Sequence, residues 1–267
     1  MSISKTTLSN GLTVITYAMP SVRSISLGLW FNVGSRDEST NQAGLTHFME
    51  HMMFKGTSTK GPLDISMHFD KLGAEFNAFT SKEYTCYYAR FVDNKLEEAL
   101  SMLAEMVIDS TFSNEAIQTE REVVIEEIAR SEDTPDDYVF ELYNSSTFHG
   151  HKLGLPVLGT RERVGSYTHD DCQNFHDAFY HTGNLVIAAA GNLDHDALVD
   201  MVNRHFSSMK VGTKNNRILT IPSFSSGLHF AQRETEQAHL LYGFPWYGVG
   251  DKRRYAGSVL TTLLGGS

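Results

Sequence analysis

His47-Phe48-Met49-Glu50-His51 is the stretch that most constrains this chain, because it sets two histidines and a glutamate in a segment with a helical pattern. At about 100° per residue, His47 and His51 lie about 40° apart on one helical face, with Glu50 beside them. Two imidazoles one turn apart can each place a ring nitrogen on the same Zn²⁺, at roughly 2.0–2.1 Å. The carboxylate of Glu50 can then reach a water on the metal. The pentad therefore predicts a zinc site with a general base next to it.

The composition of the chain limits how many domains it can form and which partners it can bind. It has 267 residues, of which 41% are hydrophobic and 11% aromatic, enough to build a core in one large domain or up to two ordinary ones. The formal net charge is -10. Nucleic acids and anionic membranes do not attract an acidic surface, so we expect neither as a main partner.

Cysteine content and the N-terminus indicate the compartment. Cys86 and Cys172 are the only cysteines, and two apparently unlinked cysteines favour a reducing environment. Cys86 lies in an alternating apolar run, which predicts a buried strand thiol. The first residues hold no secretory core, and no apolar run approaches the length of a membrane span. We expect a soluble cytoplasmic protein, or a protein of the mitochondrial matrix if the source is eukaryotic.

Periodicity and turn signals predict alternating strands and helices. An Asn10-Gly11 pair between two strand-like runs predicts a hairpin near the N-terminus. Further strands are expected at residues 24–33, 74–80, 83–91, 184–190 and 239–244. Helices are expected at residues 43–55, 62–72, 94–107, 114–131, 135–148, 170–180, 195–206 and 255–264. The pattern indicates an α+β fold, with helices packed on an antiparallel sheet.

A polar, irregular stretch at residues 212–227 reads as a linker between two units. The first unit, residues 1–211, contains the pentad. The second, residues 228–267, repeats the order of strand, polar loop, helix and glycine, so it reads as the truncated start of a second homologous domain. When the helices are aligned on their Ala-Gly pairs, at residues 43–44 and 256–257, the ionisable residues of the pentad fall opposite leucines. These leucines are Leu260, Leu263 and Leu264. They predict that the same helix face is apolar and buried in the core of the second domain.

A catalytic zinc site needs a third protein ligand and an open position. The expected helix at residues 114–131 offers Glu120 and Glu127, which are seven residues apart and share a face to within about 20°. Glu126 and Glu122 point elsewhere and should meet solvent. Glu127 is the predicted third ligand. Glu120 is predicted to support the site by accepting the free N–H of a ligand imidazole.

Together these residues give a family resemblance that extends over essentially the whole chain. The pentad, with the paired carboxylates Glu120 and Glu127, resembles the pitrilysin/insulinase metallopeptidases, which are inverted zincins. The nearest likeness is to the short bacterial branch similar to mitochondrial processing peptidase. The other matching motifs are Gly44-Leu45-Thr46, Asn77-Ala78-Phe79-Thr80-Ser81, Glu83-Tyr84-Thr85, Pro156-Val157-Leu158-Gly159-Thr160, Ala188-Ala189-Ala190-Gly191-Asn192 and Leu263-Leu264-Gly265-Gly266-Ser267.

The resemblance implies two homologous α+β halves around a peptide-sized chamber. It implies one Zn²⁺ per chain held by His47, His51 and Glu127, with Glu50 as the general base and Glu120 as support. It also implies an edge strand that takes substrate by strand addition, at Asn77, Ala78 and Phe79. The Arg and Tyr that help to hold substrate in the family's second half have no counterpart in this chain.

The implied activity is a zinc-dependent endopeptidase that hydrolyses peptides or unfolded, presequence-like segments. Glu50 would take the proton of the attacking water and pass it to the leaving amine. The alternative is a subunit of the same fold that is non-catalytic, or that binds zinc and peptide but needs a C-terminal half or a homologous partner. A homodimer or heterodimer therefore remains open.

The same residues admit other interpretations. The pentad alone fits a solvated helix face, and so do the two glutamates. Asn77 can simply cap a turn. His149 and His151 form an H-x-H pair, but they lie in an expected loop without a third ligand, so surface histidines are the better interpretation.

Overall fold

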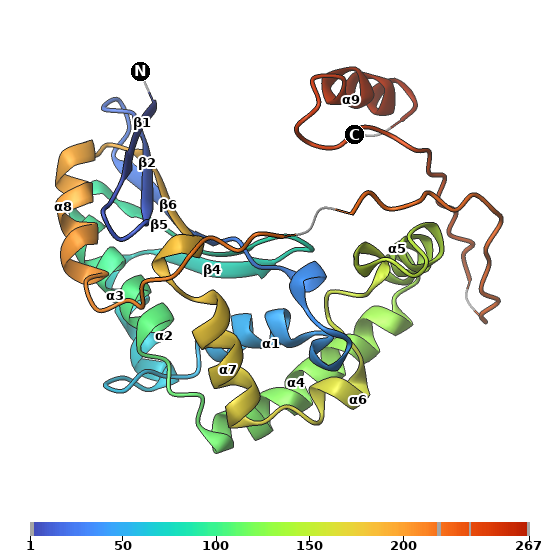
Figure 1. Cartoon of the computed structure of the whole chain (residues 1–267), viewed down its shortest axis with the longest axis horizontal. Coiled ribbons are helices and arrows are strands. Elements are labelled where there is room, and N and C mark those ends of the chain that lie inside the picture. The colour runs from blue at the N-terminus through green and yellow to red at the C-terminus, as the bar shows by residue number, and fades with distance from the viewer. Residues whose placement is uncertain (1–2, 218–219, 235, 266–267) are drawn as a thin grey trace.

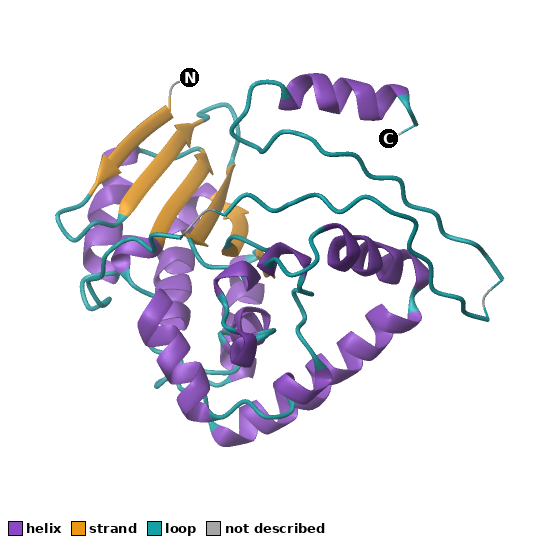
Figure 2. Ribbon diagram, turned by 45° about the vertical axis from the view of Figure 1, so that its right-hand side comes forward, coloured by secondary structure: helices purple, strands orange, loops and turns teal. Residues whose placement is uncertain are grey.

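The computed structural model describes residues 3–217, 220–234 and 236–265. Its centre is a six-stranded sheet with helices packed against one face (Figures 1 and 2). The strand order is β1-β2-β6-β3-β5-β4. The strands are β1 Ile3–Thr7, β2 Thr13–Ala18, β3 Ser24–Phe31, β4 Glu75–Thr80, β5 Thr85–Val92 and β6 Leu185–Gly191.

The strands pair mostly as the sequence predicts. The Asn10-Gly11 turn joins β1 to β2, and Gly11 takes the left-handed conformation (φ 91°) that this turn needs. All neighbouring strands are antiparallel except β2 and β6, which are parallel. The sheet is therefore mixed rather than purely antiparallel. A strand late in the chain lies between two early ones, and local patterning carries no information about such an insertion.

The α+β class is confirmed, and most helices begin and end near the expected residues. The helices are α1 Leu45–Met52, α2 Pro62–Leu72, α3 Leu96–Ile108, α4 Asn114–Asp133, α5 Pro135–Thr147, α6 Arg161–Val164, α7 His169–Phe179, α8 His195–His205 and α9 Arg254–Leu263. Short 3-10 turns lie at Ser35–Asp37, Thr40–Gln42, Asp93–Lys95, Lys152–Gly154 and Thr182–Asn184. The side chain of Asp194 accepts a hydrogen bond from the Ala197 N–H, so Asp194 caps α8.

The core lies between the sheet and the helices. In β3, Ile25, Leu27, Leu29 and Phe31 are buried, whereas Trp30 between them is partly exposed on the other face. This period-2 alternation is what one covered face of a sheet requires. Cys86 and Cys172 are both free and buried.

The C-terminal part differs from the expectation in one respect. Residues 239–244 were expected as a strand, but they are coil, and Leu240, Tyr242 and Phe244 are exposed. A strand needs a neighbour to satisfy its backbone, and the described residues provide no neighbouring strand there. The prediction of a strand was therefore wrong.

Helix α9 forms near its predicted position, but none of its residues is buried. The predicted core leucines Leu260, Leu263 and Leu264 are exposed. Their burial in a complete second domain, and the division at residues 211 and 227, stay predictions. Residues 1–2, 218–219, 235 and 266–267, which include the last two residues of the final matching motif, lie outside the described residues.

The described residues between 212 and 253 run as coil and turns over one side of the molecule (Figures 1 and 2). Nε of Arg217 donates to Asp37 at 2.7 Å, and His239 lies 3.2 Å from a carboxylate oxygen of Asp136. These contacts place the coil beside the loop before α1 and then beside α5.

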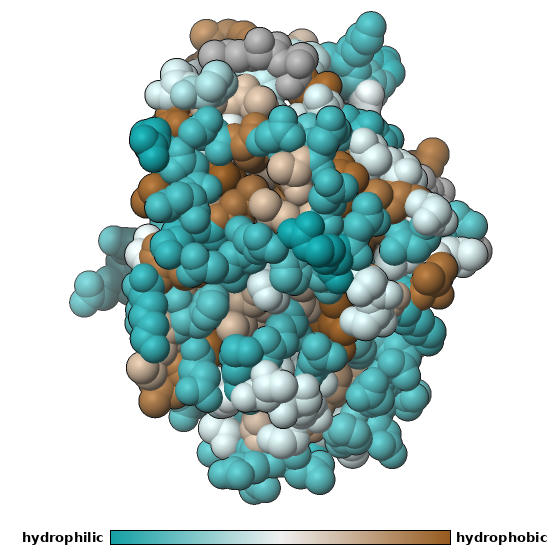
Figure 3. Space-filling model, turned by 90° about the vertical axis from the view of Figure 1, so that its left-hand side faces the viewer, coloured by the Kyte–Doolittle hydropathy of each residue, from teal (hydrophilic) through white to brown (hydrophobic). Residues whose placement is uncertain are grey.

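None of the described helices is both long and apolar enough to cross a membrane. The face in Figure 3 is mostly polar, with small groups of apolar residues between the polar ones.

Candidate metal centre

Helix α1 presents the pentad between strand β4 and helix α4. The residue before the helix is Gly44, whose φ of 93° is left-handed. Buried Glu38 binds this end, because its carboxylate accepts the N–H groups of Gly44 (2.9 Å) and Thr46 (2.7 Å). A carboxylate at a helix N-terminus satisfies otherwise unpaired donors and complements the helix dipole. The helix and the turn after it end at Gly56, which is also left-handed (φ 127°).

His47, His51 and Glu127 converge although Glu127 lies on a different helix, α4. One ligand atom from each of the three lies within 4.8 Å of the others. Oε2 of Glu127 lies 3.8 Å from Nε2 of His47 and 3.6 Å from Nε2 of His51. Tetrahedral bonds of roughly 2.0–2.1 Å separate donor atoms by about 3.3 Å. Both Glu127 distances are close to this spacing, and two nitrogens with one carboxylate oxygen are donors that zinc prefers.

The second ring nitrogen of His51 has a partner. Nδ1 of His51 lies 2.7 Å from Oε1 of Glu120, and Nζ of Lys55 lies 2.6 Å from Oε2 of the same carboxylate. Burial acts to raise the pKa of Glu120, but His51 and Lys55 outweigh burial and hold that pKa below its usual value. Glu120 is thus a carboxylate that only accepts, so Nδ1–H of His51 donates, and the tautomer that this contact favours in the neutral ring has its lone pair on Nε2.

His47 is buried, and burial lowers the pKa of its imidazole to about 3, with a further contribution from His51. The ring is therefore neutral at neutral pH, as a metal ligand must be. Its Nδ1 has no hydrogen-bond partner among the described residues, and Nε2 faces Glu127.

Glu50 lies beside this group. Its Oε2 accepts a hydrogen bond of 2.6 Å from the hydroxyl of Thr80, the last residue of β4. Burial raises the pKa of Glu50, and the Thr80 hydrogen bond acts in the opposite direction. A carboxylate with a raised pKa is a better proton acceptor than an exposed one.

Strand β4 is the last strand of the sheet, so one side of its backbone has no strand partner among the described residues. The side-chain oxygen of Asn77 accepts the N–H of Ala78 at 2.8 Å. Phe79 points to the open face of the sheet, where its ring lies 5.6 Å from that of Trp30. An edge of this kind can add an extended peptide as a further strand.

The structure brings the predicted ligands together and leaves the rival histidines apart. Within residues 3–217, 220–234 and 236–265, the only group of three or more metal-binding side chains is His47, His51 and Glu127. His151 instead accepts the N–H of Leu153 and contacts Thr220. Glu122 and Glu126 are exposed, as the helical spacing predicts.

Sequence analysis missed Lys55, Thr80 and Glu38. Lys55 lies four residues after His51, which is a usable signal. No local pattern connects Thr80 to Glu50 or Glu38 to the start of α1.

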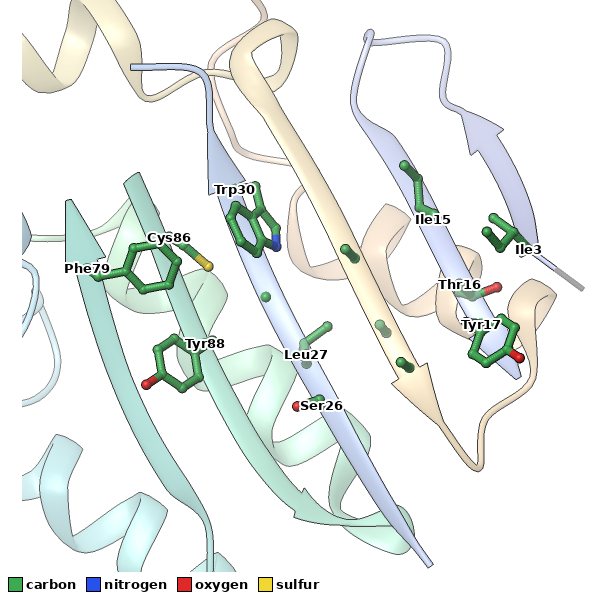
Figure 4. A pocket seen from close by; sticks show the side chains of 14 residues that line it. Ile3, Ile15, Thr16, Tyr17, Ser26, Leu27, Trp30, Phe79, Cys86 and Tyr88 are labelled. Carbon is green, nitrogen blue, oxygen red and sulfur yellow. The ribbon is translucent and has the colours of Figure 1, made fainter. Parts of the chain in front are cut away.

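A separate hollow of about 430 Å³ lies on the open face of the sheet, where the side chains of Trp30, Phe79 and Tyr88 lie in front of the strands (Figure 4). None of the metal group lines it. It is lined by Ile3, Ile15, Thr16, Tyr17, Ser26, Leu27, Gly28, Trp30, Phe79, Cys86, Tyr88, Ala188, Ala189 and Ala190.

Comparison with known families decides the classification. The family model described as insulinase (peptidase family M16) matches residues 13–161, which include the metal group and β4. This chain belongs to peptidase family M16. A second model, described as the peptidase M16 inactive domain, matches residues 166–267.

Several bacterial relatives match almost the whole chain. An uncharacterized zinc protease of Mycobacterium leprae is 41% identical over 271 residues, which are 99% of this chain and 60% of the relative. An uncharacterized zinc protease of Bacillus subtilis is 42% identical over 99% of this chain and 64% of its own length. The chain thus spans about 60% of the length of these relatives.

Solved structures share the fold of this M16 chain. A protease from Helicobacter pylori superposes with a TM-score of 0.75 over 84% of this chain and 54% of its own, at 23% identity. A peptidase M16 inactive domain from Pseudomonas fluorescens gives 0.77 over 84% of this chain and 54% of its own, at 20% identity. At these identities the likeness supports the fold alone.

Proposed function

We propose that this chain is the zinc-binding part of a metalloendopeptidase that hydrolyses peptides or unfolded polypeptide segments. The observation that carries the proposal is the convergence of His47, His51 and Glu127, with Glu50 next to them. M16 membership and relatives named zinc proteases support it.

In this proposal each residue has one task. His47, His51 and Glu127 would hold the ion. When bound, Zn²⁺ supplies Lewis acidity that polarises a peptide carbonyl and acidifies water. Glu50 accepts the proton of the attacking water and delivers it to the leaving amine. Glu120 holds the tautomer of His51 that leaves Nε2 free.

Substrate binding is assigned to the edge of β4. Asn77, Ala78 and Phe79 offer a main-chain edge that pairs with an extended peptide, largely regardless of its sequence. A folded protein does not present a free extended segment, so peptides and unfolded regions are the substrate class that fits.

The proposal extends to partners and compartment. A homologous half or subunit, as a homodimer or heterodimer, would complete the substrate site. Two free, buried cysteines support a reducing compartment, and the cytoplasm is the proposed one.

Zinc content tests the site first. Zinc per chain is measured for the wild type, His51→Ala and Glu127→Gln, beside the controls His149→Ala and Glu126→Gln, which change exposed residues of the same types. We expect about one zinc in the wild type and both controls, and a loss in the two site variants. Full zinc content in Glu127→Gln would contradict the assignment of the third ligand.

A quenched-peptide assay of the same proteins tests the activity, with and without a supplied C-terminal half. Hydrolysis that follows zinc content supports the peptidase. Zinc binding without hydrolysis under either condition would favour the alternative, a zinc-binding subunit without catalysis.

A further inference from the structure

Glu120 is the most deeply buried carboxylate at the metal centre, and both of its oxygens contact a partner. Its side chain is 2% exposed. Oε1 contacts His51 Nδ1 at 2.7 Å, and Oε2 contacts Lys55 Nζ at 2.6 Å. A buried carboxylate is costly unless it is paired. Lys55 is the only cation within ion-pair distance of Glu120 apart from His51, among the described residues.

Lys55 is held in place by the end of α1. Its N–H donates to the carbonyl of Met52 (3.1 Å), and Gly56 follows with a left-handed φ of 127°. The turn therefore carries the lysine back towards α4, onto the side of the helix where His51 lies. The result is a continuous line of contacts from Lys55 through Glu120 to His51.

We propose that Lys55 is a positioning residue of the metal centre: its ammonium fixes one oxygen of Glu120, so that the other stays on Nδ1 of His51 and Nε2 stays free for the metal. This inference rests on the proposed zinc site and adds a residue to it. Lys55 touches neither the ligand atoms nor a substrate, so it acts through Glu120.

Charge repulsion and positioning predict opposite changes in zinc affinity when Lys55 is removed. A lysine near a dication opposes metal binding through charge alone. If repulsion were its main effect, its removal would tighten zinc binding. If Lys55 positions Glu120, its removal weakens zinc binding, because changes to outer partners of a ligand histidine weaken metal affinity.

The chain contains a matched control for a purely structural role. Lys60 pairs with Glu105 at 2.5 Å in the same loop region. The side chains of Lys55 and Lys60 are 33% and 32% exposed. Glu105 contacts no member of the metal group in the structure; its other partners are Thr57 and Thr59. Substitution of either lysine removes an ion pair from the same region, but only the loss of Lys55 should weaken zinc binding.

The experiment measures zinc affinity by chelator competition on Lys55→Met, Lys55→Arg and Lys60→Met of the full chain. We expect a loss of about tenfold for Lys55→Met, most of the affinity back in Lys55→Arg, and a change below about twofold for Lys60→Met. In a Glu120→Gln background, Lys55→Met should add almost nothing, because its partner is gone.

A second measurement reports the tautomer of His51 and is made without metal. Nitrogen chemical shifts of the His51 ring in zinc-free protein should report one tautomer, with the proton on Nδ1, in the wild type and in Lys60→Met. Lys55→Met should show a mixture of tautomers.

Unchanged or tighter zinc binding in Lys55→Met would overturn the role of Lys55 while leaving the zinc site intact. A wild type that binds no zinc would instead overturn the proposed function, and the role of Lys55 with it.

Discussion

The hydroxyl of Thr80 donates a hydrogen bond of 2.6 Å to Oε2 of Glu50, and so joins the last residue of the edge strand β4 to helix α1. Burial raises the pKa of Glu50, and this bond partly opposes the rise. The strand proposed to bind peptide and the carboxylate proposed to act as base are therefore held together by one side-chain contact.

Replacing Thr80 by Val removes the hydroxyl while nearly keeping the shape. The hydroxyl fixes the orientation of the Glu50 carboxylate as well as lowering its pKa. Without it the base is misplaced, so kcat should fall by about tenfold to a hundredfold. Zinc content and KM should change little, because neither the ligands nor the strand edge is altered. Thr80→Ser keeps the hydroxyl and is the control. Wild-type kcat in Thr80→Val would show that Glu50 needs no such support.

Glu50→Gln removes the proton acceptor without changing the size of the side chain. Zinc content should stay at the wild-type level, because Glu50 is not among the three converging donors. Peptide hydrolysis should fall by about a hundredfold or more, the usual contribution of a general base. Glu126→Gln is the control on an exposed glutamate. Normal turnover in Glu50→Gln would refute the assignment of the base.

Gly44 is required for the start of α1. Its φ is 93°, and a Cβ there would lie 2.5 Å from the carbonyl oxygen of Leu158 and 2.8 Å from Cα of Gly159. Gly44→Ala should destabilise the fold by more than the roughly 1–2 kcal/mol of a left-handed conformation alone. Gly150→Ala is the control, because Gly150 has φ 74° and no atom within 4 Å of its Cβ position. Chemical denaturation measures both, and equal losses would rule out the close packing as the cause.

His176 makes stability depend on pH. It is largely buried, its Nε2 donates to the carbonyl of Val107 at 2.8 Å, and burial lowers its pKa. The unfolded chain therefore takes up a proton at this residue before the folded protein does, as pH falls through about 6.5. The contribution of the neutral, buried His176 to the free energy of unfolding is therefore present above that pH and is lost as the pH falls below it.

The test compares unfolding free energies at pH 7.5 and pH 5.5 in zinc-free protein. His176→Gln should show a smaller loss between the two values than the wild type, and the exposed His149→Gln should match the wild type. An equal pH dependence in His176→Gln would contradict the inference.

Much of the metal group follows from the sequence because helical spacing is local. The pentad places His47 and His51 on one face, and the seven-residue step turns Glu120 and Glu127 to one side of α4. Both pairs are read from the chain without knowledge of any distant contact. Local signals of this kind also predict the Asn10-Gly11 hairpin.

Only the tertiary structure decided which distant groups meet. It brought Lys55 to Glu120, Thr80 to Glu50 and the carboxylate of Glu38 to the start of α1, and it placed β6 between β2 and β3. It also left residues 239–244 without a neighbouring strand, although their pattern favours one. Helical and turn signals depend on neighbours a few residues away, whereas strand partners and buried ion pairs depend on contacts that the whole fold must form first.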